Sequence, residues 1–236
     1  GAVSVMNEAE PYLINCTLVE NEVTDSFGFG GAVSCGYDSE SGENAGLYTY
    51  ALLENCILWD NFAVFGPQAA LGDPLDLENQ IISLEVSHSD IQGGVEDIYL
   101  GEPAGNTWVY DAGGIIDADP MFIAVSDREG ASAQAYYLSQ VDPDGIEPLQ
   151  EAFFDPGQNN PCVNAGSGPA GDLSDLLGFD VTTRTDHEDH SDTVDMGYHY
   201  DASLPVESYT LRAGVYIADL LRHGERRRPV RGRGGR

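Results

Sequence analysis

Two short segments of the chain hold the residue types that could bind a metal ion. The denser one mixes carboxylates with imidazoles and contains Asp186, His187, Asp189 and His190. Two imidazoles three residues apart can face one ion on a turn, with carboxylates completing the coordination shell. The alternative, which we favour, is a solvated acidic loop before a strand over 194–200.

The second segment is similar to part of a calcium-binding loop. Asp142 and Asp144 surround a proline and precede Gly145. The position expected for the first ligand holds Gln140, so the match to a calcium loop is partial. Asp-Pro-Asp-Gly is typical of a β-turn, and we interpret it as one. No cofactor is required by either segment, and Ca²⁺ is the ion that such oxygen-rich sequence would attract.

No residue of the chain is predicted to be catalytic. The sequence His88-Ser89-Asp90 has the composition of a catalytic triad, but adjacent residues of a strand point to opposite faces. We therefore interpret it as ordinary strand sequence. The many carboxylates could supply pairs for glycoside hydrolysis, but their abundance says nothing about their placement.

Aromatic residues form a third candidate site. If they emerged on one face they could stack against sugar rings, although such residues beside leucine repeats are more often part of a core. The candidates are Tyr48, Tyr50, Trp59, Phe62 and Phe65.

The charge distribution restricts the partners of the chain. There are 40 acidic and 10 basic residues, and every basic residue is an arginine. Eight arginines and two acids lie in 212–236, a net charge of +6, whereas 1–211 holds 2 arginines and 38 acids, a net charge of −36. Such a body repels nucleic acid and anionic surfaces. No apolar run approaches the roughly 20 residues of a membrane span.

Internal repeats predict how these residues are positioned. Gly-Ala-Val-Ser occurs at 1–4 and again at 31–34, and Leu-x-Asn-Cys-x-Leu occurs at 13–18 and again at 53–58. A third copy of the second pattern is either 77–82 or 86–91. Spacings of 24 to 40 residues are typical of a solenoid, and the short β-branched segments bounded by Gly, Asn and Asp indicate strands.

These patterns predict an all-β fold, a right-handed parallel β-helix. Stacked layers would align Cys16 with Cys56, and Asn15 with Asn55 in an amide ladder, while Gly30 would relieve a tight bend. We expect β-helix coils over 1–123, whose N-terminal part is missing, and an acidic loop over 38–44. A β-rich C-terminal cap, with strands near 135–139 and 194–200, is expected over 124–200, and a linker with an Arg-rich, disordered tail over 201–236.

Seven sequence pieces, in order, resemble bacterial parallel β-helix repeat proteins of the pectin-lyase-like fold with a choice-of-anchor Q type C-terminal region. They are LENCILWDN at 53–61, SDIQGG at 89–94, IDADPMF at 116–122, YLS at 137–139, NPCVNAG at 160–166, TTR at 182–184 and VDMGYHY at 194–200. The resemblance implies an exported or surface-attached protein and implies no single activity.

We therefore expect a non-catalytic secreted or cell-surface β-helix of bacterial origin. It would be a monomer that acts as an adhesive or carbohydrate-contacting scaffold, with polysaccharide or cell-surface glycan as partner. The alternative is a polysaccharide-active lyase or glycoside hydrolase of the same fold. The lyase chemistry is disfavoured because lysine is absent and only Arg128 and Arg184 precede the tail.

Overall fold

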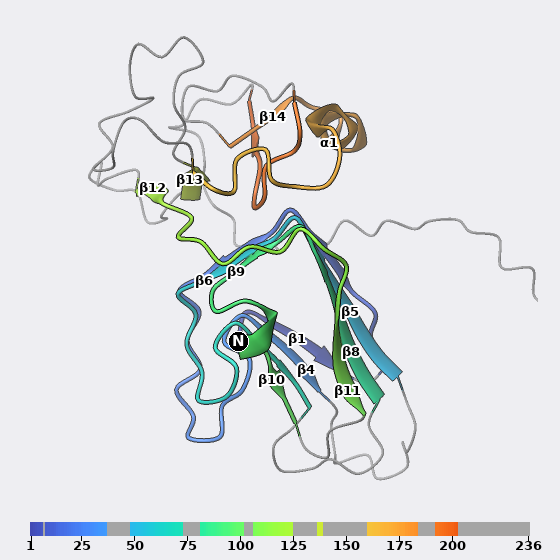
Figure 1. The fold of residues 1–236 in the computed structure, drawn as a ribbon, viewed down its shortest axis with the longest axis vertical. Helices are drawn as coiled ribbons and strands as arrows, with labels where there is room; N and C mark the ends of the chain where they lie inside the picture. The colour runs from blue at the N-terminus through green and yellow to red at the C-terminus, as the bar shows by residue number, and fades with distance from the viewer. Residues whose placement is uncertain are drawn as a thin grey trace, which may run out of the picture.

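The computed structural model describes residues 1–6, 8–36, 48–72, 81–101, 106–124, 136–138, 160–183 and 192–202. Within these ranges the chain is β-rich and builds three stacked parallel sheets (Figure 1). The predicted loop at 38–44 and the predicted tail from 203 onwards lie outside the described residues.

The chain visits the three parallel sheets in turn and then repeats the circuit, so each circuit forms one layer. The first sheet contains β1 (Val3–Met6), β4 (Val33–Gly36), β7 (Ala69–Leu71) and β10 (Tyr99–Leu100). The second sheet contains β2 (Tyr12–Ile14), β5 (Tyr48–Glu54), β8 (Ile81–Ser87) and β11 (Thr107–Asp111). The third sheet contains β3 (Thr17–Val19), β6 (Ile57–Trp59) and β9 (Asp90–Ile91).

The strand register follows the sequence repeats. Val3 pairs with Val33, Leu13 with Leu53 and Leu18 with Leu58, all in parallel. The third copy of the leucine pattern is 86–91, because Val86 pairs with Leu53 and Ile91 with Leu58. The predicted alignment of successive copies is therefore confirmed.

Inward-facing aliphatic side chains fill the space between the three sheets. Along β5 the side chains at alternate positions are buried, as expected of a strand with one face on a core. Stacking then places like residues above one another, and this core includes Val5, Leu13, Val33, Leu53, Leu58, Leu71, Leu84, Val86 and Ile91.

The turn between the second and third sheets takes a left-handed backbone in each layer. Asn15 and Asn55 have φ values of 51° and 54°, and His88 at the same place has 42°. Asparagine tolerates this conformation better than most residues. The backbone N–H of Asn15 donates to the backbone carbonyl of Glu54 over 2.9 Å, so the two turns are stacked.

The predicted amide ladder at these turns is wrong. The side chain of Asn15 donates to the Asp195 carbonyl (3.2 Å), and that of Asn55 accepts from the Ser167 N–H (2.7 Å). Both amides point outward and are used by the C-terminal region. An amide chain exists instead after the third sheet, where hydrogen bonds of 2.7–2.9 Å link Asn21, Asn61, Gln68 and Gln92.

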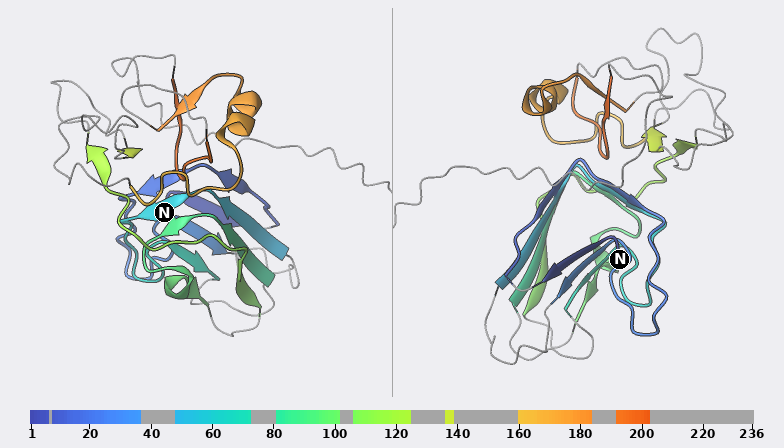
Figure 2. Two further views of the ribbon diagram at one scale, coloured as in Figure 1. Left: turned by 45° about the horizontal axis from the view of Figure 1, so that its top comes forward. Right: turned by 180° about the vertical axis from the view of Figure 1, so that it is seen from behind.

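The C-terminal region contacts the flank of the stack at the corner between the second and third sheets, and not an end, where we expected a cap (Figures 1 and 2). Tyr198 N–H donates to Thr17 Oγ1 (2.9 Å) in the first layer, and Gly197 N–H donates to the Asn55 carbonyl (2.7 Å) in the second. A second small core lies here, formed by Ile57, Leu138, Cys162 and Met196. The third sheet has apolar side chains on its outer side. The C-terminal region lies here because it shields those side chains from water.

The strand expected near 135–139 is present, but the rest of the secondary structure of the C-terminal region differs from the prediction. Two antiparallel pairs occur, β12 (Phe122–Ala124) with β13 (Tyr136–Leu138) and β14 (Val181–Thr182) with β15 (Tyr200–Asp201). The predicted strand over 194–200 is present only at its last residue. An unpredicted helix, α1 (Ala170–Leu177), begins after Pro169 and ends at Gly178 in a left-handed conformation, φ 79°.

A 3-10 turn at Val95–Asp97 is the remaining helical element of the described ranges. No helix within those ranges has both the length and the apolar character needed to cross a bilayer.

Replacing Gly30 with alanine should destabilise the protein by about 1–3 kcal/mol. Gly30 has a φ of 67°, and a Cβ there would overlap the Val33 carbonyl oxygen of the same layer. As a control, Gly171 of α1 has open space around its Cβ position, so Gly171→Ala should be neutral or stabilising. Urea unfolding of the two variants checks this, and equal effects would contradict it.

Candidate functional site

Five aromatic side chains project from the outer side of the second sheet, and we call this surface the aromatic face. It consists of Tyr12 on β2, Tyr48 and Tyr50 on β5, and Trp108 and Tyr110 on β11. Their positions follow from the two-residue period of strands, which turns Thr49, Ala51 and Leu53 inward and leaves the intervening residues outward. Tyr110 is 59% exposed and Trp108 is 42% exposed, so the rings are available to a ligand.

Four of the five rings, all except Tyr110, form one contiguous group that crosses the layers. The Tyr48 and Tyr50 rings are stacked with centroids 6.2 Å apart, and Tyr12 meets Tyr50 edge to face at 6.1 Å. Trp108 lies 6.4 Å from Tyr48 in a tilted arrangement. Trp108 and Tyr50 both pair with Ser83, which lies in the layer between them. Trp108 is therefore two layers from Tyr50, about 9.6 Å along the stack.

Two phenol groups of the aromatic face are held by hydrogen bonds to β8. Tyr50 donates to Glu85 Oε2 over 2.8 Å, and the Tyr48 hydroxyl lies 2.6 Å from Ser83 Oγ. Burial, followed by the hydrogen bond to Glu85, raises the pKa of Tyr50 far above its ordinary value. Tyr50 therefore remains a neutral donor, and both rings are fixed in orientation before any ligand arrives.

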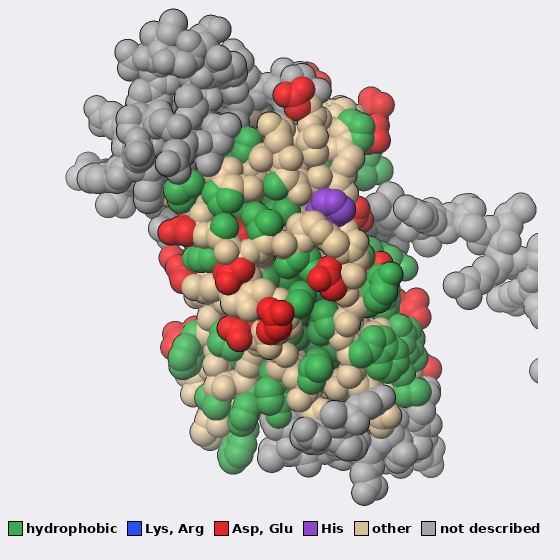
Figure 3. Space-filling model, in the orientation of Figure 1, with side chains coloured by type: hydrophobic (Ala, Val, Ile, Leu, Met, Phe, Trp, Pro, Cys, Tyr) green, Lys and Arg blue, Asp and Glu red, His purple; other side chains and the backbone are tan. Residues whose placement is uncertain are grey.

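The surroundings of the aromatic face are acidic. No lysine or arginine occurs in any of the described ranges, since all ten arginines lie between or after them. Figure 3 shows hydrophobic side chains on the flank where β5, β8 and β11 lie, with Asp and Glu side chains around them. A polyanion would be repelled by this surface.

The predicted aromatic site is partly correct. Tyr48 and Tyr50 lie on the aromatic face, but Trp59 packs against the second core and the Phe65 ring contacts Tyr99 in a tilted arrangement, with centroids 5.1 Å apart. Phe62 is exposed in the loop after β6. Tyr12, Trp108 and Tyr110 were missed, although the alternation Trp-Val-Tyr at 108–110 matches Tyr-Thr-Tyr at 48–50 and indicates that Trp108 and Tyr110 share one face of a strand.

The predicted metal ligands lie outside the described residues, so their prediction stays untested. They are Asp142, Asp144, Asp186, His187, Asp189 and His190. In the part of the chain that the structure describes, no three His, Cys, Asp or Glu side chains are grouped to hold an ion.

The residues His88, Ser89 and Asp90 do not form a triad. Ser89 Oγ donates to the Ser87 carbonyl (2.8 Å) and accepts from the Cys56 N–H (3.0 Å), while Asp90 lies in β9 beside Ile57. The His88 Nδ1 atom lies 2.8 Å from Ser87 Oγ. The Ser89 side chain thus links two adjacent layers, and the three side chains show no hydrogen-bond relay from acid to base to nucleophile.

Asp90 has a buried carboxyl group that accepts hydrogen bonds from two donors. Its Oδ1 accepts from the Ala118 N–H (3.2 Å), and its Oδ2 accepts from the Cys162 thiol (3.1 Å). Burial raises the pKa of Asp90 to about 6, partly offset by these two hydrogen bonds. Burial and the Asp90 charge also raise the pKa of Cys162, so this thiol stays protonated. The pair joins the third sheet to the C-terminal region and is closed to substrate.

The four cysteines are present as free thiols. Cys16 and Cys56 occupy equivalent positions in adjacent layers, as predicted, since the next residues, Thr17 and Ile57, are paired. The Cys56 thiol donates to the Leu13 carbonyl over 3.3 Å.

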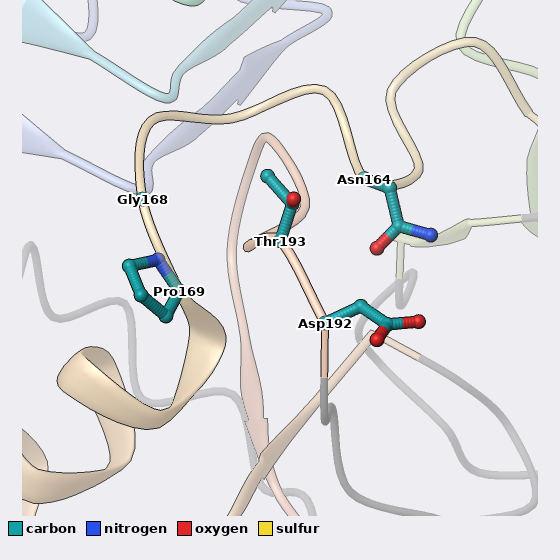
Figure 4. Close-up of a pocket in the computed structure, with 5 residues that line it drawn as sticks. All are labelled: Asn164, Gly168, Pro169, Asp192 and Thr193. Atoms are coloured by element: carbon teal, nitrogen blue, oxygen red, sulfur yellow. The ribbon is translucent and has the colours of Figure 1, made fainter.

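A shallow open depression lies beside α1 (Figure 4). It is lined by Asn164, Gly168, Pro169, Asp192 and Thr193. Its walls are joined by backbone hydrogen bonds, from Ala170 to Asp192 and from Val194 to Gly168. Among the described residues, its lining offers a single carboxylate, Asp192, and no base paired with a nucleophile.

Comparison of the chain with family models, curated proteins and solved structures finds no match. The aromatic face is therefore interpreted from its own geometry.

Proposed function

We propose that the chain belongs to a non-catalytic, carbohydrate-binding scaffold built as a right-handed parallel β-helix of the pectin-lyase-like type. The three stacked parallel sheets support the β-helix. Its right hand is proposed because parallel crossover connections are right-handed in about 98% of cases. The ordered sequence pieces support a choice-of-anchor Q type C-terminal region. That resemblance supports a location outside the cell or on the surface of a bacterium.

The aromatic face is the observation that carries the proposed binding function. Solvent-exposed rings in fixed orientation offer apolar surface to the C–H faces of sugar rings at little cost in side-chain entropy. The carboxylate of Glu85 on the same face can accept hydrogen bonds from sugar hydroxyls. A row of exposed rings that crosses several layers suits one extended glycan chain.

Replacing Trp108 with alanine should weaken glycan binding at least tenfold, which corresponds to about 1.4 kcal/mol. Trp108 is exposed, so its loss removes stacking area and leaves the core intact. Phe62→Ala is the matched control, because Phe62 is also exposed but lies away from the second sheet. Isothermal titration against a panel of neutral, cationic and anionic oligosaccharides measures both variants.

Absence of binding to every glycan in the panel, or equal losses in the two variants, would contradict the proposal. Release of shorter sugars during the same incubations would contradict the non-catalytic part and favour a polysaccharide-active enzyme.

A further inference from the structure

The aromatic face combines exposed rings with carboxylates and lacks any basic side chain. Glu85 and Glu54 occupy outward positions on β8 and β5, and Glu10 is exposed two residues before Tyr12. Glu85 has one oxygen bonded to Tyr50 and Glu54 has one oxygen bonded to Ser167 Oγ (2.6 Å). Each carboxylate thus retains a second oxygen that can accept from a ligand.

We propose that the ligand of this face is a cationic glycan, an amino-sugar polymer that carries free ammonium groups. This inference rests on the proposed carbohydrate-binding function and specifies its ligand class. An ammonium group over the face of Trp108 or a tyrosine is attracted by the ring quadrupole. The same group can donate three hydrogen bonds, which carboxylates accept more strongly than neutral oxygens do.

The negative charge of the protein repels anionic glycans and adds to the attraction for cationic glycans. The described surface has no cation to pair with a uronic acid carboxylate, and the whole chain carries a net charge of −30. A polymer with several ammonium groups would contact Glu10, Glu54 and Glu85 in succession while its rings stack on the tyrosines. Neutral glycans gain the stacking alone.

The test compares three hexasaccharides of matched length by titration: glucosamine, N-acetylglucosamine and galacturonic acid. The glucosamine hexamer should bind at least tenfold more tightly than the acetylated hexamer at low salt, and the galacturonate hexamer should not bind. Raising the salt to 0.5 M should remove most of this preference, because exposed charges are then screened.

A double variant separates a local effect from the net charge of the protein. The double variant Glu10→Gln, Glu54→Gln should lose most of the preference for glucosamine but keep binding of the acetylated hexamer.

Equal binding of the acetylated and cationic hexamers would overturn this inference and leave the proposed function standing. An unchanged preference in the double variant would also overturn it, because it would show attraction to net charge alone. Failure of all three hexamers to bind would overturn both proposals.

Discussion

Replacing Asp90 with asparagine should raise the free energy of unfolding by up to about 3 kcal/mol at pH 7.5. The pKa of this carboxyl group rises from its ordinary 3.8 to about 6 on folding, because the group is buried between the third sheet and the C-terminal region. Each unit of pKa difference corresponds to about 1.36 kcal/mol. Asparagine keeps the oxygen that accepts from Ala118 and never carries the charge.

The direction of the pH dependence follows from this raised pKa. Folding favours the protonated carboxyl, so the native state gains stability from Asp90 below pH 3.8 and loses it as the pH rises through 6. The difference in stability between Asp90→Asn and the parent protein should therefore grow between pH 4 and pH 6 and become constant above pH 7.

Urea unfolding across pH 4–8 measures that difference directly. Asp97→Asn serves as the control, since Asp97 is an exposed acid whose removal only lowers the net negative charge. A parent-minus-variant difference that is flat with pH, or that matches the control, would show that Asp90 is not a buried carboxyl group of raised pKa.

Replacing Leu58 with alanine should destabilise the protein by about 2–5 kcal/mol, the range for removing a fully buried leucine side chain. Leu58 is 0% exposed and lies between Leu18 and Ile91, its partners in the adjacent layers. The cavity would open in the centre of the stack, where neighbouring layers restrict relaxation. Thermal unfolding monitored by circular dichroism provides the measurement.

The control for Leu58 is a leucine outside the stack. Leu176 of α1 is 51% exposed, so Leu176→Ala should change the stability by less than about 0.5 kcal/mol. Similar melting temperatures for the two variants would mean that Leu58 is not in a packed core.

The stacking could be predicted from the sequence because stacked layers repeat their own environment. Residues that occupy equivalent places in successive layers meet equivalent neighbours, so Leu13 and Leu53, or Val3 and Val33, leave a visible period. The left-handed turn at Asn15 and Asn55 is also visible in the sequence as a repeat. Only the role of the two amides was misjudged, because their partners Asp195 and Ser167 are more than 100 residues away along the chain.

The C-terminal region could not be predicted in the same way, since it does not repeat. Its place on the flank depends on contacts of Tyr198, Cys162 and Met196 with several layers at once, and no local pattern encodes such contacts. The helix α1 is short and amphipathic over only two turns, with proline before it and glycine after it. These end signals are local, and they could have been used.

The aromatic face was predictable in part for a similar reason. Tyr48 and Tyr50 belong to one strand, so their common side follows from the period of two. The addition of Trp108 and Tyr12 depends on the register between β2, β5 and β11, which the irregular spacing of the repeats concealed.

Spin labels on outward positions of the second sheet test the central claim, that successive segments stack in register as layers. Tyr12 is aligned with Leu52, then Glu85, then Tyr110. In a background whose four cysteines are replaced and whose circular dichroism is unchanged, labels would be placed at 12 and at one of the other three positions. Backbone separations of about 4.8, 9.6 and 14.4 Å are expected, from the strand spacing.

Dipolar broadening should therefore be strongest for the pair 12 and 52, weaker for 12 and 85, and weakest for 12 and 110. Broadening that is absent from all three pairs, or that does not decrease in this order, would contradict the stacked layers and with them the aromatic face.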